Sequence, residues 1–252
     1  MRTAASKDPT PTTEAYGKRE LILEMLSLLI DEFNCNHQAD LTDADGRVKI
    51  YERENEMKTI TNFINENMKK AKPALLYLCG HPGTGKTSTL NFVLSGFTSG
   101  NLEANLIRRL SVSMYNAMSF KDVRSFCCQL LIDLSPKLSG QEMKGIKKSE
   151  FDDDELANKV AKMFSAKPAE TKILVIDEID AFETNPQAFL TLTKAILTQN
   201  TNTLIVGIAN SVDLPFKRKH SAIALRDTQL LFEPYNEEQI TTIIEEKVNT
   251  RF

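Results

Sequence analysis

A glycine-rich octet has the residue types and the spacing of a phosphate-binding loop. It fits the pattern G-x-x-x-x-G-K-[ST] and reads Gly80-His81-Pro82-Gly83-Thr84-Gly85-Lys86-Thr87. Its glycines permit backbone angles that turn several N–H groups toward phosphate oxygens, and a helix beginning near Lys86 would point its positive end at the same anion. Lys86 is expected to reach the β- and γ-phosphates of a nucleotide, and the Thr87 hydroxyl to coordinate Mg²⁺. The alternative interpretation is a glycine-rich turn without a ligand.

Two adjacent carboxylates, Asp177 and Glu178, follow the apolar run 173–176. The carboxyl end of a buried parallel strand faces the crevice where ligands bind. At that position Asp177 is expected to hold Mg²⁺, and Glu178 to orient and polarise the water that attacks the γ-phosphate. A strand that ends in acids could equally be the cap of a helix. The place of the pair downstream of Lys86, in the same alternating pattern, favours the catalytic interpretation.

A neutral amide, Asn210, ends a further apolar run at 203–209. It can hydrogen-bond the γ-phosphate or the attacking water without adding negative charge. By itself Asn210 would be only a turn residue. Its place on a strand expected to run parallel to that of Asp177 makes it, with Lys86 and Glu178, a predicted catalytic residue.

These side chains need a scaffold, and the sequence predicts one. Continuous apolar runs are typical of strands buried on both faces of a sheet, and they occur at 75–79, 106–112, 173–176 and 203–208. Amphipathic spacing predicts helices at 52–70, 87–97, 120–134, 154–164 and 186–198. Such alternation indicates an α/β fold with a parallel sheet and right-handed crossovers. The polar stretch 137–155 is expected to be an exposed insertion.

Composition narrows the function classes. The 252 residues are 41% hydrophobic and 26% charged, with a net charge of −3, which excludes a globally basic nucleic-acid coat but not a local basic patch. No apolar run approaches the roughly 18 residues of a membrane span, so no membrane partner is expected. The four cysteines lack metal-ligand spacing, and without a signal peptide they are predicted to be reduced thiols in an intracellular protein.

The N-terminal part carries no chemistry that we assign. Residues 1–17 are predicted to be a disordered tail, and residues 18–47 a helix and a loop. The segment 41–52 partly matches a calcium-binding EF-hand loop, but Leu41 stands where the loop requires a carboxylate. A solvated acidic turn is therefore the favoured interpretation.

Taken together, the motifs resemble those of the AAA+ ATPases. More narrowly they resemble the replication-initiator clade, which contains cell division control protein 6 and the largest subunit of the origin recognition complex. The shared elements are GHPGTGKT at 80–87, VIDEID at 175–180, GIANSVDLP at 207–215, FEPYNEEQI at 232–240, and Arg53-Glu54 before the first helix of the module. The likeness covers about residues 48–250 and favours the cell division control member.

This resemblance implies a P-loop NTPase (AAA+) fold, with a parallel five-stranded sheet between helices in a nucleotide-binding domain at 48–232. Residues 233–252 would begin a helical lid that is incomplete. ATP and Mg²⁺ are the implied cofactors, and Arg53 and Tyr235 are implied to flank the adenine. The implied role is an ATP switch in the nucleus that hydrolyses slowly during origin complex assembly and helicase loading. Origin recognition complex subunits and the replicative helicase would be its partners, with DNA contacted through the full assembly.

The sequence also departs from the family pattern. Where the family has an arginine that reaches the γ-phosphate of a neighbouring subunit, ungapped alignment places Ala224, and Arg226 or Arg218 is a possible substitute. The chain stops at Phe252, one helix into the lid, which suggests a fragment, a truncated gene product or a diverged protein. Two other functions stay open: a non-catalytic nucleotide-binding scaffold, and a clamp-loader-like or transposition-type ATPase.

Overall fold

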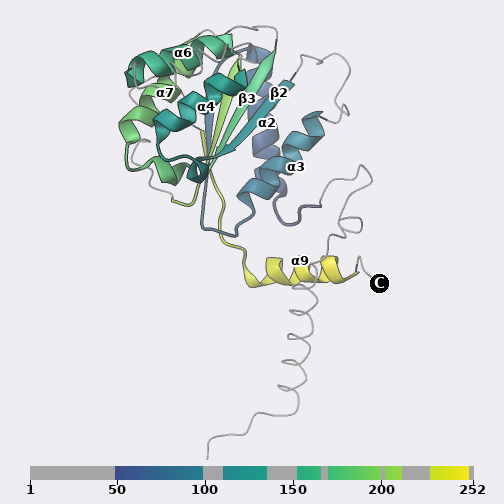
Figure 1. Cartoon of the computed structure of the whole chain (residues 1–252). Helices are drawn as coiled ribbons and strands as arrows, with labels where there is room; N and C mark the ends of the chain where they lie inside the picture. The colour runs from purple at the N-terminus through teal and green to yellow at the C-terminus, as the bar shows by residue number, and fades with distance from the viewer. Residues whose placement is uncertain are drawn as a thin grey trace, which may run out of the picture. The chain divides into compact units, whose positions relative to one another are not determined.

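The computed structural model describes six stretches of the chain: 49–98, 110–134, 152–165, 170–199, 202–211 and 228–249 (Figure 1). The chain divides into one unit of residues 49–246 and another formed by residues 1–48 with 247–252. The predictions for the tail, the first helix, the EF-hand-like segment before Lys49, the insertion up to residue 151, and Arg218, Ala224 and Arg226 lie outside the described residues.

Five parallel strands form one sheet in the order β2-β3-β4-β1-β5, which confirms the expected five-stranded parallel architecture. The strands are β1 (Ala74–Cys79), β2 (Leu110–Asn116), β3 (Thr171–Asp177), β4 (Thr203–Ala209) and β5 (Thr228–Leu231). The three inner strands β1, β3 and β4 are buried along almost their whole length. Burial on both faces explains why they read as continuous apolar runs.

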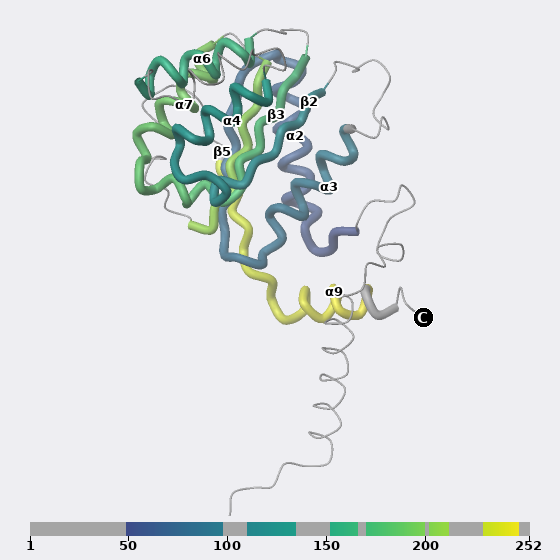
Figure 2. Tube along the Cα trace, in the orientation of Figure 1, coloured from purple at the N-terminus to yellow at the C-terminus, as the bar shows by residue number. Residues whose placement is uncertain are grey.

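Helices cover both faces of the sheet (Figures 1 and 2). One face packs against α2 (Glu54–Lys70) and α3 (Lys86–Thr98). The other face packs against α4 (Val123–Leu134), α6 (Asp153–Ser165) and α7 (Pro186–Thr198). A further helix, α9 (Glu237–Asn249), follows β5, and none of the helices in the described stretches is long and apolar enough to cross a membrane.

The two-residue period of the strands divides the core into two layers. Along β1, Leu75 and Tyr77 contribute to the core cluster on the α4–α6–α7 side, whereas Leu76 and Leu78 contribute to the cluster under α2 and α3. Successive side chains of a strand point to opposite faces, so an all-apolar strand fills both layers at once. Because all five strands are parallel, their carboxyl ends lie at one edge of this buried sheet.

Two predicted elements have an end that differs by three residues or more, and a third element was not located. β2 extends to Asn116 rather than ending at residue 112, because its second half pairs with β3 as far as the Asn116–Asp177 pair; residues 106–109 of the predicted strand lie outside the described residues. As an edge strand it is half-buried, and Met114 is 41% exposed, so no apolar run marks that half. Helix α4 begins at Val123 rather than residue 120, because the Asp122 carboxylate accepts a hydrogen bond from the Ser125 N–H at 2.7 Å and caps it. β5 was not located from the sequence.

In the described stretches, Cys79, Cys127 and Cys128 are not joined in disulfides. Cys79 and Cys127 are buried, and Cys128 is half-buried. Burial raises the pKa of the Cys127 thiol above its ordinary value. A thiol that is hard to ionise is a poor nucleophile, which agrees with a packing role for this residue.

Candidate functional site

The glycine-rich octet connects the end of β1 at Cys79 to α3, which begins at Lys86. This is the strand–loop–helix context that a phosphate-binding loop requires. Gly80, Gly83 and Gly85 have φ angles of 151°, 80° and 84°, a range that L side chains rarely adopt. The loop backbone is therefore curled as predicted, and the N-terminus of α3 adds its partial positive charge to the same place.

At two of these glycines a close neighbour also leaves no room for a side chain. A Cβ atom at Gly80 would lie 2.3 Å from the carbonyl oxygen of Phe232, and one at Gly85 would lie 2.9 Å from the Tyr235 hydroxyl. At Gly83 such an atom would meet nothing within 4 Å. The segment after β5 thus packs against two corners of the loop and leaves the third open.

Lys86 is 6% exposed, and its ammonium group lies inside the curl of the loop. Its Nζ donates hydrogen bonds to the carbonyl oxygens of Gly80 at 2.7 Å and His81 at 2.9 Å, and to Oδ1 of Asn210 at 3.1 Å. Burial lowers the pKa of Lys86, an effect larger than the opposing influence of nearby carboxylates such as Glu178. A desolvated cation of this kind attracts an anion much more strongly than a solvated one does.

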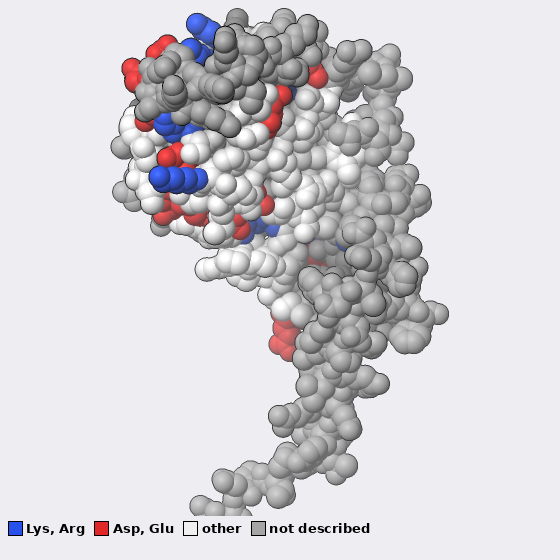
Figure 3. All heavy atoms as spheres, in the orientation of Figure 1, with Lys and Arg blue, Asp and Glu red and all other residues white. Residues whose placement is uncertain are grey.

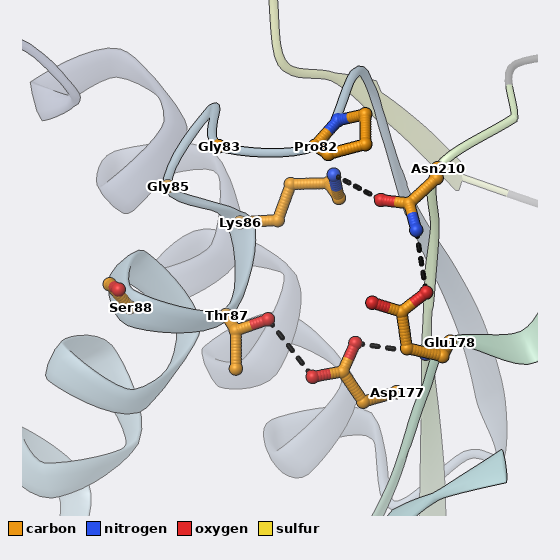
Figure 4. Close-up of a pocket in the computed structure, with 9 residues that line it drawn as sticks. All are labelled: Pro82, Gly83, Gly85, Lys86, Thr87, Ser88, Asp177, Glu178 and Asn210. Atoms are coloured by element: carbon orange, nitrogen blue, oxygen red, sulfur yellow. Dashed lines mark hydrogen bonds between the residues drawn. The ribbon is translucent and has the colours of Figure 1, made fainter. Parts of the chain in front are cut away.

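Thr87 and Asp177 meet across the pocket (Figure 4). The Thr87 hydroxyl donates to Oδ2 of Asp177 at 3.0 Å, and Oδ1 of Asp177 accepts a hydrogen bond from the Glu178 N–H at 2.9 Å. Within the described stretches no group of three His, Cys, Asp or Glu residues could hold a metal ion. One hydroxyl and one carboxylate fit Mg²⁺, which commonly takes one or two protein ligands and completes its shell with phosphates and water.

Glu178 has a left-handed backbone, with φ 55° and ψ 42°. This conformation is uncommon for a residue other than glycine and costs about 1–3 kcal/mol, so the surroundings must maintain it. Oε2 of Glu178 accepts a hydrogen bond from Nδ2 of Asn210 at 2.5 Å. Because Oδ1 of the same amide binds Lys86, Asn210 bridges the cation and the carboxylate.

The pocket has a volume of about 220 Å³ and is lined by Pro82, Gly83, Gly85, Lys86, Thr87, Ser88, Asp177, Glu178 and Asn210 (Figure 4). The structure therefore brings together all five side chains to which catalysis or metal binding was assigned. Ser88 was not predicted, although its place directly after Lys86-Thr87, on the first turn of α3, could have indicated it. The other three octet residues, Gly80, His81 and Thr84, are not among the lining residues. Thr84 is buried and its hydroxyl donates to the His81 carbonyl at 2.8 Å, so it shapes the loop.

Arg53 and Tyr235 lie together beside the loop and do not line this pocket. The Arg53 guanidinium lies 4.0 Å from the centroid of the Tyr235 ring and donates to the carbonyl oxygen of Glu233 at 2.7 Å. It also forms a 2.7 Å ion pair with Glu56, and only 3% of its surface is exposed. Arg53 therefore anchors the segment after β5 to the start of α2.

Asp180 is the last residue of the VIDEID motif and no role was predicted for it, yet it contacts Asn210 of the site. Its Oδ2 accepts a hydrogen bond from the backbone N–H of Asn210 at 2.6 Å, and its Oδ1 one from that of Ser211 at 3.3 Å. The signal in the sequence was its spacing two residues after Glu178. That spacing does not reveal the contact, because the partners are 30 and 31 positions away.

Charges on the face shown in Figure 3 are of both signs. Lysine and arginine side chains of the described residues lie there among aspartate and glutamate side chains rather than in one continuous patch. Cationic attraction on the described part of this face is thus local.

Comparisons with known proteins agree with this geometry. Residues 69–213 match the family model described as AAA domain. The human Cell division control protein 6 homolog is 30% identical over 229 residues, which are 88% of this chain and 38% of that protein. Human Origin recognition complex subunit 1 is 27% identical over 203 residues, which are 78% of this chain and 22% of that protein. The chain thus spans well under half the length of these relatives.

Solved structures share the fold. The Aeropyrum pernix ORC1 protein, solved in complex with DNA, has a TM-score of 0.63 at 20% identity over 84% of this chain and 52% of that one. A chain of Drosophila ORC bound to DNA has a TM-score of 0.56 at 20% identity over 98% of this chain and 55% of that one. Because the family match covers more than half of its residues, the chain belongs to the AAA domain family, and it is a homologue of cell division control protein 6 and origin recognition complex subunit 1.

Proposed function

We propose that this chain binds ATP with Mg²⁺ in the pocket between the phosphate loop and the acidic end of β3, and hydrolyses it slowly. One observation carries the proposal. Lys86 and Thr87, Asp177 and Glu178, and Asn210 come from three separate segments and line one pocket. A buried cation, two oxygen ligands and a carboxylate beside an amide are the set that phosphoryl transfer to water needs.

The residues have distinct roles in this proposal. The backbone N–H groups of residues 80–85 bind phosphate oxygens, and Lys86 binds the β- and γ-phosphates. Thr87 and Asp177 hold Mg²⁺, which when bound neutralises charge on the phosphate oxygens. Glu178 orients the attacking water and accepts its proton, and Asn210 binds the γ-phosphate or that water.

The same proposal extends to the adenine and to neighbouring subunits. Arg53 and Tyr235 flank the adenine, which the place of the Tyr235 hydroxyl close to Gly85 and the contact of Arg53 with the Tyr235 ring support. Residues 48–232 act as the nucleotide-binding domain, and α9 is the first helix of a lid. In an assembly, an arginine of one subunit reaches the γ-phosphate bound by its neighbour, and Arg226 and Arg218 are the candidates in this chain.

We propose further that ATP serves as a switch in DNA replication initiation in the nucleus. The supporting relatives are Cell division control protein 6 homolog and Origin recognition complex subunit 1. By analogy the partners are origin recognition complex subunits and the replicative helicase, and DNA is contacted through the full assembly. The DNA in the two solved structures named above supports the last point.

The test is ATP binding and turnover by the purified chain, alone and with origin recognition complex subunits. We expect the wild-type chain to associate with these subunits only when ATP and Mg²⁺ are present. Lys86→Ala should lose both binding and association, and Glu178→Gln should keep binding and lose turnover. Lys194→Ala, which removes an exposed lysine of α7, is the matched control.

Two outcomes would change the conclusion. If Lys86→Ala leaves an ATP-dependent association unchanged, the switch is wrong. If the wild-type chain binds ATP but shows no turnover even with the partner subunits, the non-catalytic scaffold replaces the ATPase.

A further inference from the structure

Asp180 connects two chain segments at the edge of the site. It lies on the short 3₁₀ helix η4 (Ile179–Phe182), which follows Glu178 directly. Its carboxylate accepts hydrogen bonds from two successive backbone N–H groups, those of Asn210 at 2.6 Å and Ser211 at 3.3 Å. Hydrogen bonds to an ionised acceptor are roughly twice as strong as neutral ones, so this bridge is a firm one.

Helix η4 is itself held rigidly, so Asp180 is a fixed point. Ile179 is fully buried and Phe182 is 2% exposed. The Phe182 ring packs between the rings of Phe126 and Phe189, with both centroid distances 5.6 Å. The Ile179 side chain lies against Gly207 of β4, where it would be 3.0 Å from an added Cβ atom. A displacement of Asp180 would therefore disturb the aromatic core.

Asn210, in contrast, lies just beyond the sheet. The ladder between β1 and β4 ends with the Cys79–Ala209 pair, so strand pairing does not determine where Asn210 lies. Its amide must nevertheless reach Lys86 at 3.1 Å and Glu178 at 2.5 Å together. A short side chain can make both contacts only when its own backbone is fixed.

We infer that Asp180 is a positioning residue, which fixes the backbone of Asn210 so that its amide bridges Lys86 and Glu178. Asp180 acts through Asn210, and it is not among the residues that line the pocket. The catalytic consequence rests on the proposed function, whereas the structural part does not.

The structural part is tested on the full chain by NMR hydrogen exchange without nucleotide. Asp180→Asn keeps the shape, but it removes the charge and replaces one of the two accepting oxygens with an NH₂ group, which donates instead. We expect the Asn210 and Ser211 amides to exchange about tenfold faster in this variant. Glu183→Gln, which neutralises an exposed carboxylate in the next turn, should leave both rates unchanged. Equal rates in the wild-type chain and Asp180→Asn would overturn the inference.

The catalytic part is tested by a double-mutant cycle on ATP turnover. Asp180→Asn should lower kcat about tenfold, consistent with the loss of a charge-assisted hydrogen bond, and leave KM for ATP within about twofold. In an Asn210→Ala background the same substitution should have little further effect, because the side chain being positioned is gone. Additive losses would show that Asp180 does not act through Asn210. If the wild-type chain shows no turnover, the proposed hydrolysis fails, and amide exchange still decides the positioning role.

Discussion

Two buried lysines, one at the carboxyl edge of the sheet and one near its amino edge, donate hydrogen bonds to main-chain carbonyl groups. At the carboxyl edge Lys86 is 6% exposed, and near the amino edge Lys172, the second residue of β3, is 8% exposed. Lys172 donates to the carbonyl oxygens of Phe164 at 2.8 Å and Met163 at 3.2 Å. Those carbonyls end α6, where a cation offsets the negative end of the helix, so Lys172 is a helix cap.

Lys86 has the same type of acceptor but different surroundings. It lies in an open pocket, and three carboxylates, those of Asp177, Glu178 and Asp180, act on its charge. Its acceptors belong to a curled loop instead of a helix end. Residue type and burial are alike in the two lysines, and the adjacent cavity and acids distinguish the lysine that we propose binds phosphate from the one that caps a helix.

Near each of these two edges, a residue other than glycine has a left-handed backbone. Ala71 has φ 50° and lies three residues before β1. It ends α2, where its N–H donates to the carbonyl oxygen of Met68 at 3.2 Å, an ordinary helix terminus. Glu178 takes the same conformation at the carboxyl edge and contacts Asn210. The left-handed conformation thus ends a helix at Ala71, whereas at Glu178 it places the side chain beside Asn210.

The largest effect in this comparison is expected from Glu178→Gly. Glycine adopts the left-handed conformation freely, so the chain should stay folded, while loss of the carboxylate should lower ATP turnover at least about 100-fold. Turnover under saturating ATP is measured, with circular dichroism to confirm folding. A variant that keeps more than about a tenth of the activity would show that Glu178 is not the base.

Lys86→Met comes next. Loss of the cation should weaken ATP binding about 100-fold, because truncating one partner of a buried charged pair costs about 2–5 kcal/mol and each 1.4 kcal/mol is about tenfold. Calorimetric titration with a non-hydrolysable ATP analogue measures it. Lys172→Met is the matched control and should bind the analogue like the wild-type chain. Equal weakening in both variants would remove the distinction between the two edges.

Lys172→Met should instead reduce stability. Two hydrogen bonds to the end of α6 are lost, and we expect the free energy of unfolding to fall by about 1–3 kcal/mol. Urea unfolding followed by circular dichroism gives this value. An unchanged midpoint would mean that Lys172 does not cap α6.

Ala71→Gly should give the smallest effect, a gain in stability of about 0.5–1 kcal/mol, since glycine is the preferred residue at a left-handed helix terminus. The same urea experiment measures it, and ATP turnover should not change. A loss of stability would show that the conformation of Ala71 carries no strain.

Local signals in the sequence predicted several elements well. Helix α7 has the predicted bounds, because Pro186 starts it and the Asn185 side chain accepts a hydrogen bond from the Ala188 N–H at 3.3 Å. The inner strands were found from their continuous apolar runs. The edge strands were predicted less well: β2 is half-buried and was expected to end at residue 112, and β5, which is only four residues long and pairs with β1 alone, was not located.

The sequence by itself determined which side chains gather at the carboxyl edge. Asp177 ends a buried parallel strand, Asn210 follows another directly, and Lys86 closes the loop after a third. Parallel strands end at one edge. Tertiary structure alone decided how they interact. The Lys86–Asn210 contact joins residues 124 positions apart, and Arg53 reaches Glu233 across 180 positions. The left-handed backbone of Glu178 and the bridge from Asp180 to Asn210 likewise depend on packing between distant segments, which no local pattern encodes.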